Sequence, residues 1–161
     1  MADFGEIIDI MDLDVVSWLR TEMGKICSKE KNPVATVAVD FDGVIHDYTQ
    51  GWQDGSIYGA FVEGAVAALL DLTQRFSVFI HTTRNPSQVA SWIEEKSDGF
   101  LRCTTVVPEN GFWNKCRLGL LLVTDRKLPA VAYIDDRAIR FRDWDQALRD
   151  LRWALTKESD G

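Results

Sequence analysis

Short apolar runs that alternate with helical segments constrain the fold of this 161-residue chain more than any other feature. The run at 34–39 is apolar at odd and even positions alike, and Asp40 follows it. Such a run is typical of a strand buried on both faces of a parallel sheet. Further strand candidates lie at 76–80, 104–107, 118–123 and 131–134. Helical periodicity predicts helices between and after them, at 62–75, 86–96 and 143–157.

Strands that alternate with helices form βαβ units, which build a parallel sheet through right-handed crossovers. We therefore predict an α/β fold, a three-layer Rossmann-like sheet with helices on both faces. Residues 34–161 are expected to form this single domain. Ahead of it, apolar residues at three- and four-residue spacing predict an amphipathic helix at 12–27, so that 1–33 forms an N-terminal helix and linker.

Charge and cysteine content exclude several classes of protein. The chain has 18 Lys and Arg against 25 Asp and Glu, a net charge of −7. Proteins that bind long nucleic acid or anionic membranes normally present a basic face, so neither partner is expected. Cys27, Cys103 and Cys116 lack C-x-x-C spacing and are expected to be reduced, and no secretory signal is recognisable. We therefore expect a cytoplasmic protein without a membrane span; the oligomeric state is not predicted.

Polar residues gather where the predicted strands end. Carboxylates follow the first strand within 40–43, hydroxyl and basic residues follow the second at 81–84, and carboxylates recur at 135–137. In open parallel sheets, ligands bind outside the carboxyl ends of the strands. These segments are therefore expected to meet at one edge of the sheet.

Three of these carboxylates, Asp40, Asp42 and Asp136, would repel one another unless a cation neutralised them. Oxygen ligands of this kind suit Mg²⁺, which binds through one or two carboxylates together with a phosphate. Asp40 and Asp42 lie on the same side of an extended segment. One carboxylate can then attack phosphorus while the other handles the proton of the leaving group.

Three further residues suit a phosphoryl group. Gly43 allows a sharp turn that aims backbone N–H groups at phosphoryl oxygens. Thr82 offers a hydroxyl donor, and Lys127, in the loop before the run at 131–134, offers a positive charge. Thr83 is an alternative to Thr82, because a one-residue shift of the strand end exchanges them, and Lys115 is an alternative to Lys127.

Together these segments resemble the four motifs of the haloacid dehalogenase superfamily, in that family's order: Asp-Phe-Asp-Gly-Val at 40–44, Thr82, Lys127 and Ile-Asp-Asp-Arg at 134–137. The resemblance covers residues 34–145. It implies that Asp40 is the nucleophile of an aspartyl-phosphate mechanism and Asp42 the general acid/base. Thr82 would bind the phosphoryl group, and Lys127 would steady it.

The resemblance also implies a Mg²⁺ site. Asp136 would hold the ion with the Asp40 carboxylate and the Asp42 backbone carbonyl, and Asp135 would lie beside them. The intervals between the motifs are too short for a large cap domain. The turn-rich loop at 46–61, which we call the flap, would then help to define the pocket.

The implied activity is a Mg²⁺-dependent phosphatase that acts on a small phosphorylated metabolite, with a nucleotide as the preferred candidate. Small size and the Ile-Asp-Asp-Arg motif are similar to 5′(3′)-deoxyribonucleotidases and to phage and bacterial hydrolases of this superfamily. The alternatives are a polynucleotide 3′-phosphatase and a catalytically idle binding module. Candidate substrate contacts, beside Gly43, are Tyr48, Trp52, Thr83, Arg84 and Arg137. Each arginine has a second interpretation as the partner of a local carboxylate, and each aromatic residue as packing within the flap.

Overall fold

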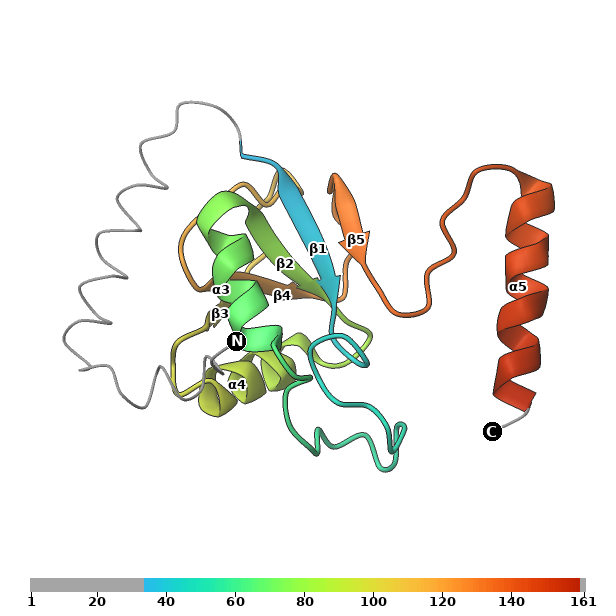
Figure 1. Ribbon diagram of the computed structural model, residues 1–161. Coiled ribbons are helices and arrows are strands. Elements are labelled where there is room, and N and C mark those ends of the chain that lie inside the picture. Colours follow the sequence, from blue (N-terminus) through green and yellow to red (C-terminus); the bar gives the residue numbers. More distant parts are fainter. Residues whose placement is uncertain (1–33, 160–161) are drawn as a thin grey trace.

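The computed structural model describes residues 34–159, which form a parallel β-sheet with accompanying helices (Figure 1). The predicted helix at 12–27 and the linker after it lie outside the described residues. The elements, in chain order, are β1 (Thr36–Asp40), α3 (Ala65–Arg75), β2 (Ser77–His81), α4 (Pro86–Lys96), β3 (Arg102–Thr104), β4 (Leu120–Thr124), β5 (Ala132–Ile134) and α5 (Trp144–Ser159). The prediction of an α/β fold with a parallel sheet is confirmed, with every strand within a few residues of its expected position.

The order of the strands reverses direction at β1. The sheet runs β3-β4-β2-β1-β5, and all of its pairings are parallel. The chain thus moves from β1 to one side, and β5 then returns to the other side of β1. Ligands bind at such a reversal, outside the carboxyl ends of the two strands. Because Val39 pairs with Ile134, the residues that follow them, Asp40 and Asp135, lie side by side.

Helices α3 and α4 cover one face of the sheet. The odd-numbered valines of β1, Val37 and Val39, point to this face and pack in one cluster with Leu69 of α3 and with Val89 and Ile93 of α4. All five side chains are buried. This alternation follows from the period of two in a strand.

Side chains from connecting loops pack against the opposite face of the sheet. Ala38 and Phe79 point to it, and they pack against Trp113 and Leu128 from connecting loops. Among the described residues no helix lies over this face, so the predicted second layer of helices is not seen there. Helix α5 lies apart from the sheet (Figure 1), with apolar side chains such as Trp144 exposed. No helix of the described part of the chain is long and apolar enough to cross a membrane.

The turn between β2 and α4 follows the sequence closely. The Asn85 side chain accepts hydrogen bonds from the backbone N–H groups of Ser87 at 2.9 Å and Gln88 at 3.3 Å, and Pro86 begins the helix. An asparagine cap followed by proline stops the helix from extending backward. This cap sets Arg84 in the short connection that leaves the carboxyl end of β2.

The cysteines differ from the expectation in one respect. Cys103 is a free thiol, and burial raises its pKa to about 12. Cys116, in contrast, is disulfide-bonded, so the prediction that it is reduced is wrong. Cys27 lies outside the described residues. Spacing along the chain gave no sign of this bond, because a disulfide depends on the distance between Cα atoms in the fold.

Leu69 is expected to contribute strongly to stability. It is 2% exposed beneath the sheet, so Leu69→Ala removes apolar contacts and leaves a cavity. We expect it to lower the free energy of unfolding by about 2–5 kcal/mol in urea titrations. Leu148→Ala on α5, at a position 43% exposed, is the matched control and should change it much less. Equal losses in the two variants would contradict the packing described above.

Candidate functional site

Three carboxylates meet where β1 and β5 end. Asp40 closes β1, and Asp135 and Asp136 follow β5 directly. Each offers one carboxylate oxygen, and these oxygens all lie within 4.8 Å of one another. Asp40 is partly buried, whereas the other two residues are exposed. We call Asp40, Asp135 and Asp136 the acidic triad; oxygen atoms at this spacing fit a hard divalent cation such as Mg²⁺.

Electrostatics make the triad unfavourable on its own. Burial, opposed by the backbone hydrogen bond from Phe41 and reinforced by repulsion from Asp135, Asp136 and Asp42, raises the pKa of Asp40 from its ordinary 3.8 to about 6. Near neutral pH the site therefore holds crowded negative charge. A divalent cation would relieve both the burial of charge and the repulsion.

Gly43 is required by the position of Asp136. Its φ angle is +86°, which side chains rarely adopt, and a Cβ atom built on it would lie 2.4 Å from Asp136 Oδ2. Only glycine lets the turn after β1 approach that carboxylate so closely. The sequence-based interpretation of Gly43 as a residue that permits close approach fits this geometry, with a carboxylate as its observed neighbour.

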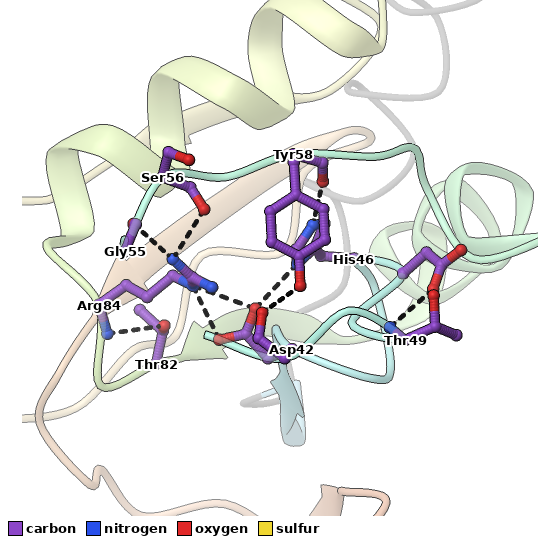
Figure 2. A network of polar contacts seen from close by, with 10 residues as sticks. Asp42, His46, Thr49, Gly55, Ser56, Tyr58, Thr82 and Arg84 are labelled. Atoms are coloured by element: carbon purple, nitrogen blue, oxygen red, sulfur yellow. Dashed lines mark hydrogen bonds and ion pairs between the residues drawn. The ribbon is translucent and has the colours of Figure 1, made fainter. Parts of the chain in front are cut away.

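Asp42 stands outside the triad, and its carboxylate has two basic partners (Figure 2). Arg84 Nε donates to both of its oxygens, at 3.0 Å and 2.8 Å. His46 Nδ1 lies 2.8 Å from Asp42 Oδ1. Both partners are buried, with Arg84 3% exposed and His46 fully enclosed. The side chain of Asp42 is thereby fixed in one orientation.

The contacts of His46 define where its hydrogens lie. Its Nε2 is hydrogen-bonded to the carbonyl oxygen of Tyr58. A carbonyl only accepts, so Nε2 carries a hydrogen. Nδ1 then faces the Asp42 carboxyl. His46 thus links Asp42 to the flap at Tyr58.

Arg84 also fastens the flap, residues 46–61, over Asp42. Its Nη1 donates to the Gly55 carbonyl at 2.8 Å, and its guanidinium carbon lies 4.5 Å from the centroid of the Trp52 ring (Figure 2 shows the polar contacts). Its Nη2 is buried and has no hydrogen-bond partner among the described residues. Arg84 and Trp52 lie against each other, and their contacts with substrate stay a prediction.

The residues predicted to bind phosphate differ in burial and in their neighbours. Thr82 is buried, and its Oγ1 accepts a hydrogen bond from the backbone N–H of Arg84 at 3.1 Å, whereas Thr83 is exposed. Lys127 is exposed, with its ammonium nitrogen 5.3 Å from the ring centroid of Tyr133 on β5. Lys115 lies instead over Trp113, on the second face of the sheet. Of the two lysines, Lys127 is thus the one beside the strand that leads into the triad.

Arg137 and Tyr48 lie at the mouth of the site. Arg137 Nε is 3.8 Å from Asp136 Oδ2, and its guanidinium carbon is 6.0 Å from the centroid of the Tyr48 ring. Both partners of this ion pair are exposed, so it contributes little to stability. Both interpretations of Arg137, as a substrate contact and as the partner of a carboxylate, fit this position.

Sequence reasoning missed His46 as a member of the site. The only signal was its place four residues after Asp42, at the start of the flap. Two isolated bridges, between Asp42 and His46 and between His46 and Phe61, draw the ends of the flap together and turn the imidazole inward. No local sequence pattern predicts such bridges, because they depend on how the flap folds back on itself.

Comparisons with known proteins identify no relative: no family model matches the chain, and neither a curated protein nor a solved structure matches it. The relationship to the haloacid dehalogenase superfamily therefore stays a prediction from the motifs.

Ionised Asp40 is expected to destabilise the metal-free protein. Its native pKa is raised to about 6, so the native state loses stability as pH rises from about 4 through 6. Asp40→Asn should therefore be more stable than wild type at pH 7 in a chelator, on the order of 1 kcal/mol after discounting for solvent screening. The gain should shrink towards pH 4. Thermal melts test this, with Asp54→Asn in the exposed flap as a control that should give no gain.

The Arg84 contacts are expected to hold the flap closed. Arg84→Met keeps an unbranched apolar stem but removes the guanidinium and its bonds to Asp42 and Gly55. We expect hydrogen exchange across 47–61 to quicken on the order of tenfold, as for a lost charged hydrogen bond. Arg75→Met is the matched control, because Arg75 pairs with Asp71 on the exposed side of α3. Unchanged exchange in Arg84→Met would show that the flap closes without this residue.

Proposed function

We propose that this protein is a Mg²⁺-dependent phosphomonoesterase that forms an aspartyl-phosphate on Asp40. One observation supports the proposal most: Asp40 meets Asp135 and Asp136 within 4.8 Å at the carboxyl edge of the sheet. Asp42 lies two residues from Asp40 with its carboxylate fixed by buried partners. Together these would supply a nucleophile, an acid/base and a cation site at one edge of the sheet.

The acidic triad fits the ion. Asp40, Asp135 and Asp136 present oxygen atoms only, and their mutual repulsion is relieved by a cation. They would hold Mg²⁺, with the backbone carbonyl of Asp42 as the further ligand that the motif implies. The bound ion would neutralise charge on the phosphoryl oxygens during transfer.

The reaction then uses residues already described. An Asp40 carboxylate oxygen attacks phosphorus, and the bond from phosphorus to the leaving oxygen breaks. Asp42, which has to enter this step in its protonated form, gives that oxygen its proton, so an alcohol departs. Asp42 next takes a proton from water, whose oxygen attacks the aspartyl-phosphate and releases inorganic phosphate. Atoms and charges balance over the two steps, and Asp40 and Asp42 are restored.

Two further residues would contact the phosphoryl group. The Thr82 oxygen already accepts from the Arg84 backbone, so its own hydroxyl hydrogen is available to donate. Lys127 would reach the same group from beside β5 and offset its negative charge. Arg84 and His46 act through Asp42, so we assign them positioning roles.

The proposed substrate is a small phosphorylated metabolite, and a nucleotide remains the preferred candidate. A cavity of about 480 Å³ beside the triad has the size of a small-molecule site. Tyr48, which was expected to contact substrate, lines this cavity and offers one aromatic ring to a base.

Activity is expected to require both the metal and Asp40. Purified protein should hydrolyse p-nitrophenyl phosphate with Mg²⁺ and lose this activity in EDTA. Asp40→Asn removes the nucleophile and should lower kcat by about a thousandfold or more, and Asp42→Asn by roughly 10²–10⁴-fold. Asp54→Asn, an exposed flap residue, should keep wild-type rates. Activity that survives Asp40→Asn would rule out the proposed intermediate.

A further inference from the structure

The cavity beside the triad is where the leaving group would lie. It has a volume of about 480 Å³, and Gly43 and Asp136 line it, which joins it to the triad. The flap contributes Asp47 and Tyr48, and the turn before α3 contributes Glu63. A phosphoryl group at the triad would therefore direct the rest of the substrate towards the flap and this turn.

Asp47 is a fixed carboxylate in this cavity. The Thr49 backbone N–H donates to its Oδ1 at 3.0 Å, and the Asp47 backbone N–H donates to the Ala60 carbonyl at 3.0 Å. The hydrogen bonds from Thr49 lower the pKa of Asp47. Asp47 is thus held in place and stays ionised throughout the physiological range.

The charges along the cavity are unevenly placed. Asp47 and Glu63 both belong to the wall formed by the flap and the turn before α3. Arg137 is the only cation among the lining residues, and its guanidinium lies beside Asp136 and 6.0 Å from the centroid of the Tyr48 ring. The wall that would receive the leaving group thus carries two carboxylates, and the one cation of the cavity is already paired with the Asp136 carboxylate.

We infer that this site takes phosphomonoesters whose leaving alcohol is neutral or cationic, and that it rejects those with a second negative group. The inference rests on the proposed function and names its substrate class. A second phosphate or carboxylate would face Asp47 and Glu63, and the one cation of the cavity, Arg137, is already paired with Asp136. Hydroxyl or ammonium groups would instead donate hydrogen bonds to the two carboxylates. A nucleoside monophosphate belongs to the accepted class, because its leaving group is an uncharged nucleoside.

Two matched pairs of substrates test this inference. Phosphoethanolamine and phosphoglycolate have similar size but opposite charge on the leaving group. Adenosine 5′-monophosphate and adenosine 3′,5′-bisphosphate differ by one phosphate. We expect kcat/KM to favour the first member of each pair by about tenfold or more at low ionic strength, with a smaller ratio in high salt.

The carboxylates themselves are tested by substitution. Asp47→Asn with Glu63→Gln should narrow both ratios to about threefold or less, through a gain for the anionic substrates. Asp54→Asn is the matched control: its carboxylate accepts from the Ser56 backbone at 3.0 Å, as Asp47 accepts from Thr49, but it does not line this cavity. It should leave the ratios as in wild type.

The outcomes separate the two proposals. If wild type hydrolyses p-nitrophenyl phosphate with Mg²⁺ but shows ratios near one, or if the double variant keeps the wild-type ratios, the proposed function stands and this inference is overturned. If no phosphate ester is hydrolysed, the proposed function fails and the inference fails with it. Both proposals are supported if the kcat/KM ratios favour the neutral and cationic esters in wild type, narrow in the double variant and stay unchanged in Asp54→Asn.

Discussion

The candidate site depends on the parallel pairing of β1 with β5. Asp40 and Asp135 are far apart in sequence, and they become neighbours only because Val39 pairs with Ile134. Side chains alternate along a strand, so a slip of β5 by one residue against β1 would reverse the side on which its residues lie relative to those of β1. The strand order adds a second condition, since β5 must return to the free edge of β1. The register of two short strands therefore determines whether the triad exists.

The carboxylates at the ends of β1 and β5 oppose the pairing of these two strands. β5 is a short edge strand whose three residues are all exposed, so little apolar burial holds it to β1. The carboxylates at the ends of the two strands repel one another, and this repulsion adds to the larger effect of burial in raising the pKa of Asp40. A cation at the triad would turn this repulsion into attraction at both strand ends. Metal binding and the pairing of β5 with β1 would then stabilise each other, because a ligand that binds only the native state stabilises that state.

The sequence was informative where the physics is local. Apolar runs of both parities predicted the strands, and Asn85-Pro86 predicted the start of α4. The strand-end rule then placed Asp40 near Asp136 without any knowledge of the register. It did not reveal the role of Arg84, because the same residue type suits a phosphate and a buried carboxylate. Helical periodicity also did not show that α5 lies apart from the second face of the sheet. An apolar stripe predicts a helix but not the surface against which that helix packs.

The residues around Asp42 form two sets, the buried partners of its carboxylate and the residues that line the open cavity. Arg84 and His46 are buried, and each ties the Asp42 carboxylate to a carbonyl of the flap, at Gly55 and Tyr58. The flap can therefore not open at these points without disturbing the proposed acid/base. In the proposed function, substrate selection would depend on residues that line the open cavity, among them Tyr48 and Asp47. Such a division lets the cavity wall change its charge or shape while the buried contacts keep Asp42 in one orientation.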